Sequence, residues 1–329
     1  MAPTNMNTRQ ARVVDPILTT QVRGYTNAQF IFPELFPYAD IPVRGMRVVR
    51  FGQEAFRRES TRRAPGADVA AITVGYESDP VTLAQDALDA VVPREYSEEA
   101  GAVPGIDVAS MAVQQVLDKV DLGYEIDCAN LALNPANYAA KGKTALAGGD
   151  LWSNPTAKIL TQMKDFKSDF AKRIGRQPNV LVMGLDEINA LTENDNVKEQ
   201  FKYTSGDSIT VDMVARYLQL DKIVVGEAIH LPDGAADGEG ELIWKGGALL
   251  AYVNRGGSPT AKVAASSSAT ASYLAPSFGY SYRLRGYPIV EQPYWNQSRR
   301  SWLYGVTQER QAVAAMPDAG FLIQNPLGV

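Results

Sequence analysis

The side chains that most often carry catalysis are scarce in this sequence. It contains one histidine, His230, and one cysteine, Cys128, far apart along the chain. Cys128 lies on the apolar stripe of an expected helix, which favours a buried core thiol over the nucleophile of a Cys–His pair. A single histidine also excludes the common zinc sites built on histidine pairs, and there is no Gly-x-Ser-x-Gly elbow. We therefore expect no catalytic residue, no cofactor and no metal site.

Two short patterns approach a ligand-binding motif without completing it. Residues 142–144, Gly-Lys-Thr, resemble the end of a phosphate-binding loop, but the first glycine of that motif would fall at Asn137. A group of acids within residues 233–241 does not have the spacing of an EF-hand calcium loop. A solvated hairpin tip is the more common structure for such a group, whose members are Asp233, Asp237, Glu239 and Glu241.

A mixture of aromatic and basic residues near the end of the chain could stack on nucleic acid. Its aromatic members alternate along expected strands, and this spacing favours packing in a core or at an interface instead. They are Tyr280, Tyr282, Tyr287, Tyr294, Trp295, Trp302 and Tyr304, near Arg283, Arg285, Arg299 and Arg300.

Charge is unevenly distributed along the chain. Residues 44–63 contain seven arginines and two acids, whereas residues 77–127 contain twelve acids and two bases. Adjacent blocks of opposite sign are usually solvated faces of one protein. The alternative is that blocks of different copies attract one another, and the sequence leaves both open. The net charge of −5 argues against a surface that coats nucleic acid, because such a surface needs an excess of lysine and arginine.

Length and composition indicate a globular protein. With 329 residues and 45% hydrophobic side chains, the chain can bury a core without disulfides or metals. One unpaired cysteine is typical of a protein made in the cytoplasm. The N-terminus has no apolar segment of a signal peptide, and no stretch approaches the roughly 20 apolar residues of a membrane span. We expect a soluble protein without an export signal.

The N-terminal part predicts extended elements. Pro16, Pro33, Pro37 and Pro42 interrupt any regular period in residues 1–43, which we interpret as an arm. Residues 46–51 alternate as a strand, and residues 71–76 look like its partner. The basic stretch 57–66 between them has nothing with which to build a core. This pattern predicts a long two-stranded loop that needs an external partner.

The middle of the chain predicts two long helices. Asp107 is a good N-cap for a helix that runs to about Asn134, where Pro135 stops it. Its apolar residues fall on one stripe, and at 1.5 Å per residue it is a rod of roughly 40 Å. A second helix is expected to begin at Asn154 and to end at Gly175.

The following region alternates between strands and helices. We expect a strand at 180–183, a short helix from Leu185, a helix capped by Thr210 and a strand at 223–225. The remaining residues, from about 242, are rich in strands. The predicted fold class is therefore α+β.

The order of arm, basic two-stranded loop, long helix and later α/β part resembles the major capsid proteins of tailed bacteriophages, which have the Hong Kong 97-type fold. Several stretches are similar to that family's sequences, namely 156–163 with 175–183, then 221–228, and the terminal 318–325. The likeness covers nearly the whole chain from about Arg44. The likeness rests on these elements and stretches occurring together in this order, because no single motif identifies the family.

The resemblance implies a division into four parts. Residues 1–43 would be an N-terminal arm, and residues 44–92 an extended loop that lies across a neighbouring subunit. Residues 93–186 and 276–329 would form a peripheral domain around the long helix. Residues 187–275 would form an axial domain that points to the centre of each pentamer or hexamer.

The same resemblance implies an icosahedral head shell that encloses double-stranded DNA without sequence-specific binding. The location would be the virion, with assembly in the cytoplasm of the bacterial host. Partners would be other copies of the chain, a portal protein, a separate scaffolding protein and, where the shell is reinforced, a decoration protein. Some relatives link subunits through a loop lysine, but the first lysine here is Lys119. The shell would therefore be held noncovalently.

Under this resemblance, the two charge blocks would form contacts between subunits, because complementary charges determine which surfaces pair and how they align. The contacts expected from the loop are Arg44, Arg47, Arg50, Arg57, Arg58, Arg62 and Arg63. The contacts expected from the acidic surface around the long helix are Asp107, Asp118, Asp121 and Glu125.

Two other functions stay open at the level of sequence. An encapsulin, a cellular cargo compartment with the same kind of subunit, would bind a cargo peptide on its inner surface, and the enclosed material would distinguish it. A hydrolase or transferase of α/β type would need a pocket with convergent polar groups, for which the sequence offers no candidates.

Overall fold

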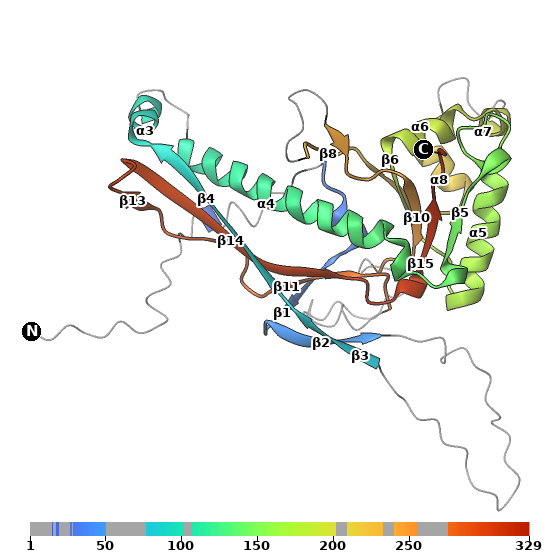
Figure 1. Ribbon diagram of the computed structural model, residues 1–329, viewed down its shortest axis with the longest axis horizontal. Coiled ribbons are helices and arrows are strands. Elements are labelled where there is room, and N and C mark those ends of the chain that lie inside the picture. The colour runs from blue at the N-terminus through green and yellow to red at the C-terminus, as the bar shows by residue number, and fades with distance from the viewer. Residues whose placement is uncertain are drawn as a thin grey trace, which may run out of the picture.

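The computed structural model of the chain describes residues 15, 18–19, 27, 29–50, 77–101, 107–201, 209–232, 240–254 and 276–328. Figure 1 shows an elongated molecule with one sheet under a long helix, α4, and a second sheet at the far end of that helix. The molecule is thus a mixed helix and sheet fold, as the sequence predicts.

The first sheet has six strands and is organised around β14 (Ser301–Val313). Strand β4 (Ala84–Pro93) pairs antiparallel with β14 over ten residues. The other edge of β14 pairs antiparallel with three shorter strands, β13 (Tyr294–Asn296), β12 (Ile289–Val290) and β11 (Tyr280–Leu284). Strand β1 (Tyr38–Ile41) pairs in parallel with β11.

Helix α4 (Val108–Leu133) lies over this sheet (Figure 1). The predicted N-cap is confirmed, because the Asp107 carboxylate accepts hydrogen bonds from the amides of Ala109 and Ser110. The predicted apolar stripe faces the strands: Val113, Val116 and Leu117 pack against Leu18, Val290 and Val306. At 1.5 Å per residue the 26-residue helix is about 39 Å long, so it spans both halves of the molecule.

The second sheet has five strands in the order β5-β15-β10-β6-β7. Three inner strands, β15, β10 and β6, have a neighbour on both edges, and β6 and β10 are buried at every residue. The bounds of the strands are β5 (Lys143–Ala145), β6 (Val180–Gly184), β7 (Lys222–Gly226), β10 (Gly247–Ala251) and β15 (Gly320–Gln324). Four helices accompany them: α5 (Ile159–Ile174), α6 (Leu185–Glu193), α7 (Asp195–Phe201) and α8 (Val211–Tyr217).

The remaining elements are short. They are α2 (Phe32–Leu35), α3 (Arg94–Gly101), β2 (Gly45–Arg50), β3 (Glu77–Thr82), β8 (Ile229–His230), β9 (Glu241–Leu242) and single turns of 3-10 helix at Pro135–Asn137, Ala140–Gly142, Gly148–Asp150 and Pro317–Ala319. No helix in the described ranges is long and apolar enough to cross a lipid bilayer.

Two predictions about these elements need correction. Helix α5 begins at Ile159 rather than at Asn154, because the Asn154 side chain accepts from the Thr156 amide and holds a separate turn. The helix does end at Gly175, which adopts φ +65°. Strand β2 pairs with Glu77–Thr82, so its partner is not residues 71–76, which lie outside the described residues.

The five-stranded sheet joins segments from several of the parts that the resemblance implies. A boundary at residue 187 separates β6 from β7, which pair in parallel within one sheet. The last strand, β15, also joins this sheet, between β5 and β10, rather than the sheet under α4. The hydrogen-bonded unit therefore combines segments from both sides of the predicted boundaries.

Candidate inter-subunit surfaces

Arg44 fixes the base of the predicted loop to its own subunit. Its guanidinium makes a two-pronged ion pair with Glu309 on β14, with Nε–Oε2 at 2.6 Å and Nη2–Oε1 at 2.7 Å. These contacts raise the pKa of Arg44 above its ordinary value. Arg47 is exposed on β2. The side chain of Arg50 and the residues Arg57, Arg58, Arg62 and Arg63 lie outside what the structure describes.

Asp121 is buried between α4 and β14 rather than displayed to a neighbour. Its Oδ1 lies 2.7 Å from Nη1 of Arg310, whose side chain is completely buried. The same guanidinium donates to the Val120 carbonyl at 3.1 Å and lies 3.9 Å from the centre of the Tyr124 ring. Burial raises the pKa of Asp121, and the charge of Arg310 opposes that rise. The pair fastens the long helix to the sheet.

Glu125 is also buried, and it joins three segments of the subunit. Its carboxylate accepts from the amides of Ile31 at 3.0 Å and Phe32 at 2.9 Å, and from the Trp244 indole at 2.5 Å. Burial raises the pKa of Glu125, and these three hydrogen bonds oppose the rise. Asp121 and Glu125 are therefore internal supports of α4, which corrects their placement on an acidic outer surface.

The other two predicted acids lie nearer the solvent. Asp107 is exposed and caps α4, and its hydrogen bonds with Ser110 lower the pKa of the carboxyl. Asp118 is half-buried and accepts from the Asn27 side-chain amide at 3.2 Å. Both therefore have a hydrogen-bonding role within the subunit.

The structure shows a different acidic surface, which we call the acidic groove. It is an open hollow of about 500 Å³ between the start of β4 and the C-terminal half of α4. Asp86 of β4 and Asp127 of α4 both line it. Other lining residues are Tyr124, Asn130, Asn134 and Arg310. Both aspartates belong to the acidic block of residues 77–127, and no local pattern distinguishes them from the other acids in it.

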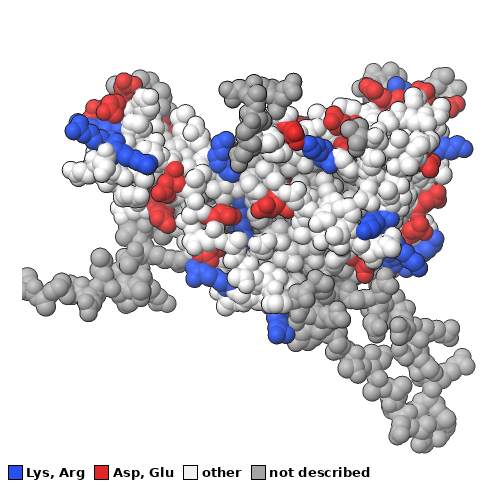
Figure 2. Space-filling view, in the orientation of Figure 1, with Lys and Arg blue, Asp and Glu red and all other residues white. Residues whose placement is uncertain are grey.

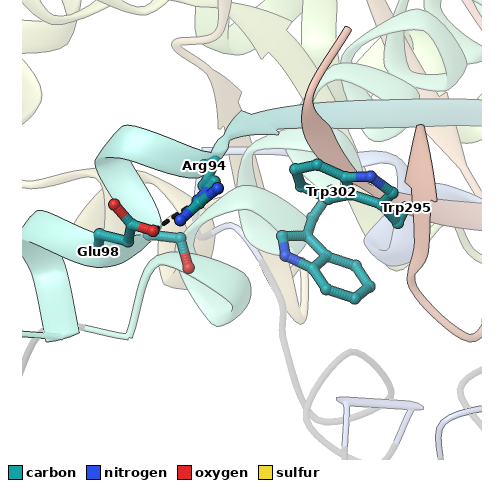
Figure 3. Close-up of a pocket in the computed structure, with 5 residues that line it drawn as sticks. Arg94, Glu98, Trp295 and Trp302 are labelled. Carbon is teal, nitrogen blue, oxygen red and sulfur yellow. Dashed lines mark hydrogen bonds and ion pairs between the residues drawn. The ribbon is translucent and has the colours of Figure 1, made fainter. Parts of the chain in front are cut away.

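A second surface, which we call the distal patch, lies at the other end of the six-stranded sheet. Trp295 and Trp302 face each other across β13 and β14, with ring centres 5.5 Å apart. Beside them on α3, Arg94 is paired with Glu98, and these side chains border a shallow hollow of about 340 Å³ (Figure 3). The indoles are 36% and 38% exposed. In contrast, Tyr280 and Tyr282 are 1% exposed and belong to the core.

The residues first considered for chemistry occupy structural positions. Cys128 is fully buried, and burial raises the pKa of its thiol well above the ordinary value, which makes it a poor nucleophile. Lys143 begins β5 and donates to the Pro135 carbonyl, so residues 142–144 do not form a phosphate-binding loop. Among the described side chains, no three or more histidine, cysteine or acidic groups gather as a metal site would require.

Comparison with known structures gives the fold a clear relative. A phage-related protein from Bordetella bronchiseptica RB50 matches with a TM-score of 0.78 at 37% identity, over 96% of this chain and 98% of that one. The capsid of cyanophage P-SCSP1u matches at 0.53 and 11% identity, over 98% and 99%. An encapsulin from Synechococcus elongatus PCC 7942 matches at 0.51 and 13% identity, over 98% and 92%. The last two show a shared fold alone.

Comparison of sequences goes further, although no family model matches the chain. The major capsid protein of Pseudomonas phage JBD67 is 28% identical over 226 residues, which cover 65% of this chain and 69% of that protein. The major capsid protein of Burkholderia phage BcepMu is 30% identical over 282 residues, which cover 85% of this chain and 86% of that protein. Because this identity extends over most of both chains, the chain belongs to the family of phage major capsid proteins.

Proposed function

We propose that the chain is the subunit of an icosahedral phage head of Hong Kong 97 type, and that its activity is self-assembly rather than catalysis. In this proposal α4 and the six-stranded sheet form the peripheral domain. The five-stranded sheet and its helices form the axial domain, which points to the centre of each pentamer or hexamer. Strands β2 and β3 begin the extended loop that lies across a neighbouring subunit.

The distal patch carries this proposal. Trp295 and Trp302 are held on paired strands, yet more than a third of each side chain is exposed in the single chain. Tryptophan is enriched at the energetic centres of protein interfaces. The patch lies at the end of the molecule farthest from the five-stranded sheet (Figure 1), so a neighbouring subunit can cover it without displacing the rest of the fold.

The charge of the molecule supports a wall around DNA rather than a DNA-binding surface. Figure 2 shows lysine and arginine interspersed with acidic side chains on the face in view, without one extended basic area. Together with the net charge of −5, this fits a shell that encloses double-stranded DNA without gripping it. The proposed location is the virion, after assembly in the host cytoplasm with a separate scaffolding protein, a portal and a decoration protein.

The encapsulin alternative has less support. The encapsulin from Synechococcus elongatus shares the fold at 13% identity, whereas the major capsid proteins of phages BcepMu and JBD67 are 30% and 28% identical to this chain. The thiol of Cys128 is fully buried, so it gives no support to a catalytic function that depends on a cysteine nucleophile.

The proposal is tested by electron microscopy of the protein expressed with the other head genes of its phage. We expect closed particles of uniform diameter that contain this chain as the main component. After deletion of the gene for this chain, no particles should form. Particles that contain a cargo enzyme and no phage genome would support the encapsulin alternative, and a chain that never leaves the monomeric state would contradict both.

A further inference from the structure

Two buried carboxyl groups lie against Trp244, in the segment between β9 and β10. The indole of Trp244 donates to Glu125 of α4. Its backbone carbonyl lies beside Glu187, which is in the first turn of α6 and is 1% exposed. Gly184 and Gly226, paired in register on β6 and β7, leave room for Trp244, because a Cβ on either glycine would collide with it. One residue thus connects this segment to both α4 and α6.

The two carboxyl groups differ in the donors that they meet. Glu125 accepts three hydrogen bonds that reach both of its oxygens, so its ionised form is satisfied. Glu187 accepts at Oε1 from the Gly246 amide at 2.8 Å, but its buried Oε2 has no partner among the described groups. A buried carboxylate oxygen without a donor is costly. The site around Glu187 therefore disfavours the ionised form.

The unpartnered oxygen of Glu187 faces an acceptor. A Cβ on Gly184 would collide with both the Trp244 carbonyl oxygen and Oε2 of Glu187, so these two oxygens are close neighbours. Two acceptors without a hydrogen between them repel each other, whereas a protonated carboxyl group has one O–H donor. A proton on Oε2 would therefore replace this repulsion with a hydrogen bond to the Trp244 carbonyl.

No cation among the described residues forms an ion pair with Glu187. Strand β6 has no charged residue, and Lys245 in the segment before β10 is paired with Glu241. Burial raises the pKa of the Glu187 carboxyl, the backbone amides of Glu187 and Gly246 oppose the rise, and the charge of Asp186 adds to it. The other charged residues on α6 and on the elements beside it are Glu193 of α6, Lys222 of β7, which pairs with Glu34, Glu227 after β7, and Asp195, Lys198 and Glu199 of α7.

We propose that Glu187 keeps its proton in the folded subunit at pH values where an exposed glutamate is ionised, and that Oε2 donates it in a hydrogen bond to the Trp244 carbonyl. This contact is a latch between α6 and the segment before β10, closed by a proton and opened by its loss. Because Trp244 also binds α4, opening the latch loosens the connection between the long helix and the five-stranded sheet. The latch lies within one subunit, so the inference does not depend on the proposed shell function.

The direction of the pH dependence follows from the raised pKa of Glu187. The folded chain holds this proton more tightly than the unfolded chain, in which the pKa has its ordinary value of 4.5. The latch is fully closed below that value, and it opens as pH rises through the folded pKa. Glu187→Gln should stay closed at every pH, because its amide can donate to the Trp244 carbonyl while its oxygen accepts from the Gly246 amide.

Infrared spectroscopy of the full chain detects the proton directly, because a protonated carboxyl group and a carboxylate have separate C–O stretching bands. At about pH 6, where an exposed glutamate is ionised, Glu187→Gln should remove one protonated carboxyl from the wild-type spectrum. Glu193→Gln, an exposed site at the other end of α6, is the matched control and should leave that band unchanged. Circular dichroism should show that both variants fold. A band that Glu187→Gln leaves intact, or that only Glu125→Gln removes, would overturn the proposal.

Hydrogen exchange measures whether the proton closes the contact. We expect the exchange of residues 243–247 in the wild type, corrected for the intrinsic effect of pH, to rise by about tenfold or more between about pH 4 and about pH 8, since one unit of pKa corresponds to tenfold. Glu187→Gln should abolish this rise, and Glu193→Gln should retain it. Equal pH dependence in the wild type and Glu187→Gln would contradict the latch. So would faster exchange of Glu187→Gln at every pH, since the ionised carboxylate would then be the form that holds the segment.

Discussion

Arg310 on β14 and Asp121 on α4 form a buried ion pair, with 2.7 Å between Nη1 and Oδ1, at the point where the long helix crosses the sheet. The Arg310 side chain is completely buried, and that of Asp121 is 11% exposed. The guanidinium also lies over the Tyr124 ring and donates to a helix carbonyl. The orientation of α4 on its sheet therefore depends on a polar contact as well as on apolar packing.

Breaking this pair should destabilise the subunit strongly. Arg310→Met leaves the Asp121 carboxylate buried without its cation, and we expect a loss of about 3–5 kcal/mol in the free energy of unfolding. The double variant Arg310→Met/Asp121→Leu should recover much of that loss, because it removes both charges. Urea unfolding of unassembled subunits measures both values. Equal stability of the single variant and the wild type would contradict this role.

Glu125 should make stability depend on pH. Its pKa in the folded state is raised above the ordinary value of 4.5, so the folded chain holds the proton more tightly than the unfolded chain. The resulting stabilisation is fully present below pH 4.5 and is lost as pH rises through the folded pKa. We expect Glu125→Gln, which does not titrate, to remove this part of the pH dependence. Unfolding measured from pH 4 to pH 8 tests the difference in slope between the two proteins.

The distal patch should affect assembly more than folding. Trp302→Ala removes an exposed indole and its contact with Trp295, and it should cost the subunit about 1 kcal/mol of stability. If a neighbour covers the patch, the same change should weaken each contact by about 2 kcal/mol and raise the concentration needed for shells. Leu303→Ala, a buried site on the same strand, is the control. It should lower unfolding stability without weakening assembly of the folded fraction. Sedimentation separates shells from free subunits.

Arg44 should protect the base of the loop. Without the two hydrogen bonds from Arg44 to Glu309, the start of β2 loses its ion pair with β14, and the chain between residues 44 and 83 should become more sensitive to proteases. Arg47→Ala, an exposed position on β2, is the matched control and should be cleaved at the wild-type rate. Limited proteolysis followed by mass spectrometry locates the cuts. Equal cleavage of Arg44→Ala and Arg47→Ala would show that the ion pair does not hold the loop base.

The sequence by itself determined the elements whose signals are local. The Asp107 cap and the apolar period define α4, and Gly175 ends α5 because a left-handed residue there costs glycine little. The position of Cys128 on the apolar stripe was enough to predict a buried thiol, which the structure confirms. In each case the physical cause lies within a few residues of the feature.

Only the tertiary structure decided which acids face the solvent. Asp121 and Glu125 are buried because their partners, Arg310 and Trp244, come from distant parts of the chain, and no local pattern reports such pairing. The same holds for the register of β2 with β3, since alternating residues fit several registers equally well. Asp86 and Asp127 meet for the same reason: a strand and a helix distant in sequence are brought together by the packing of α4 on its sheet.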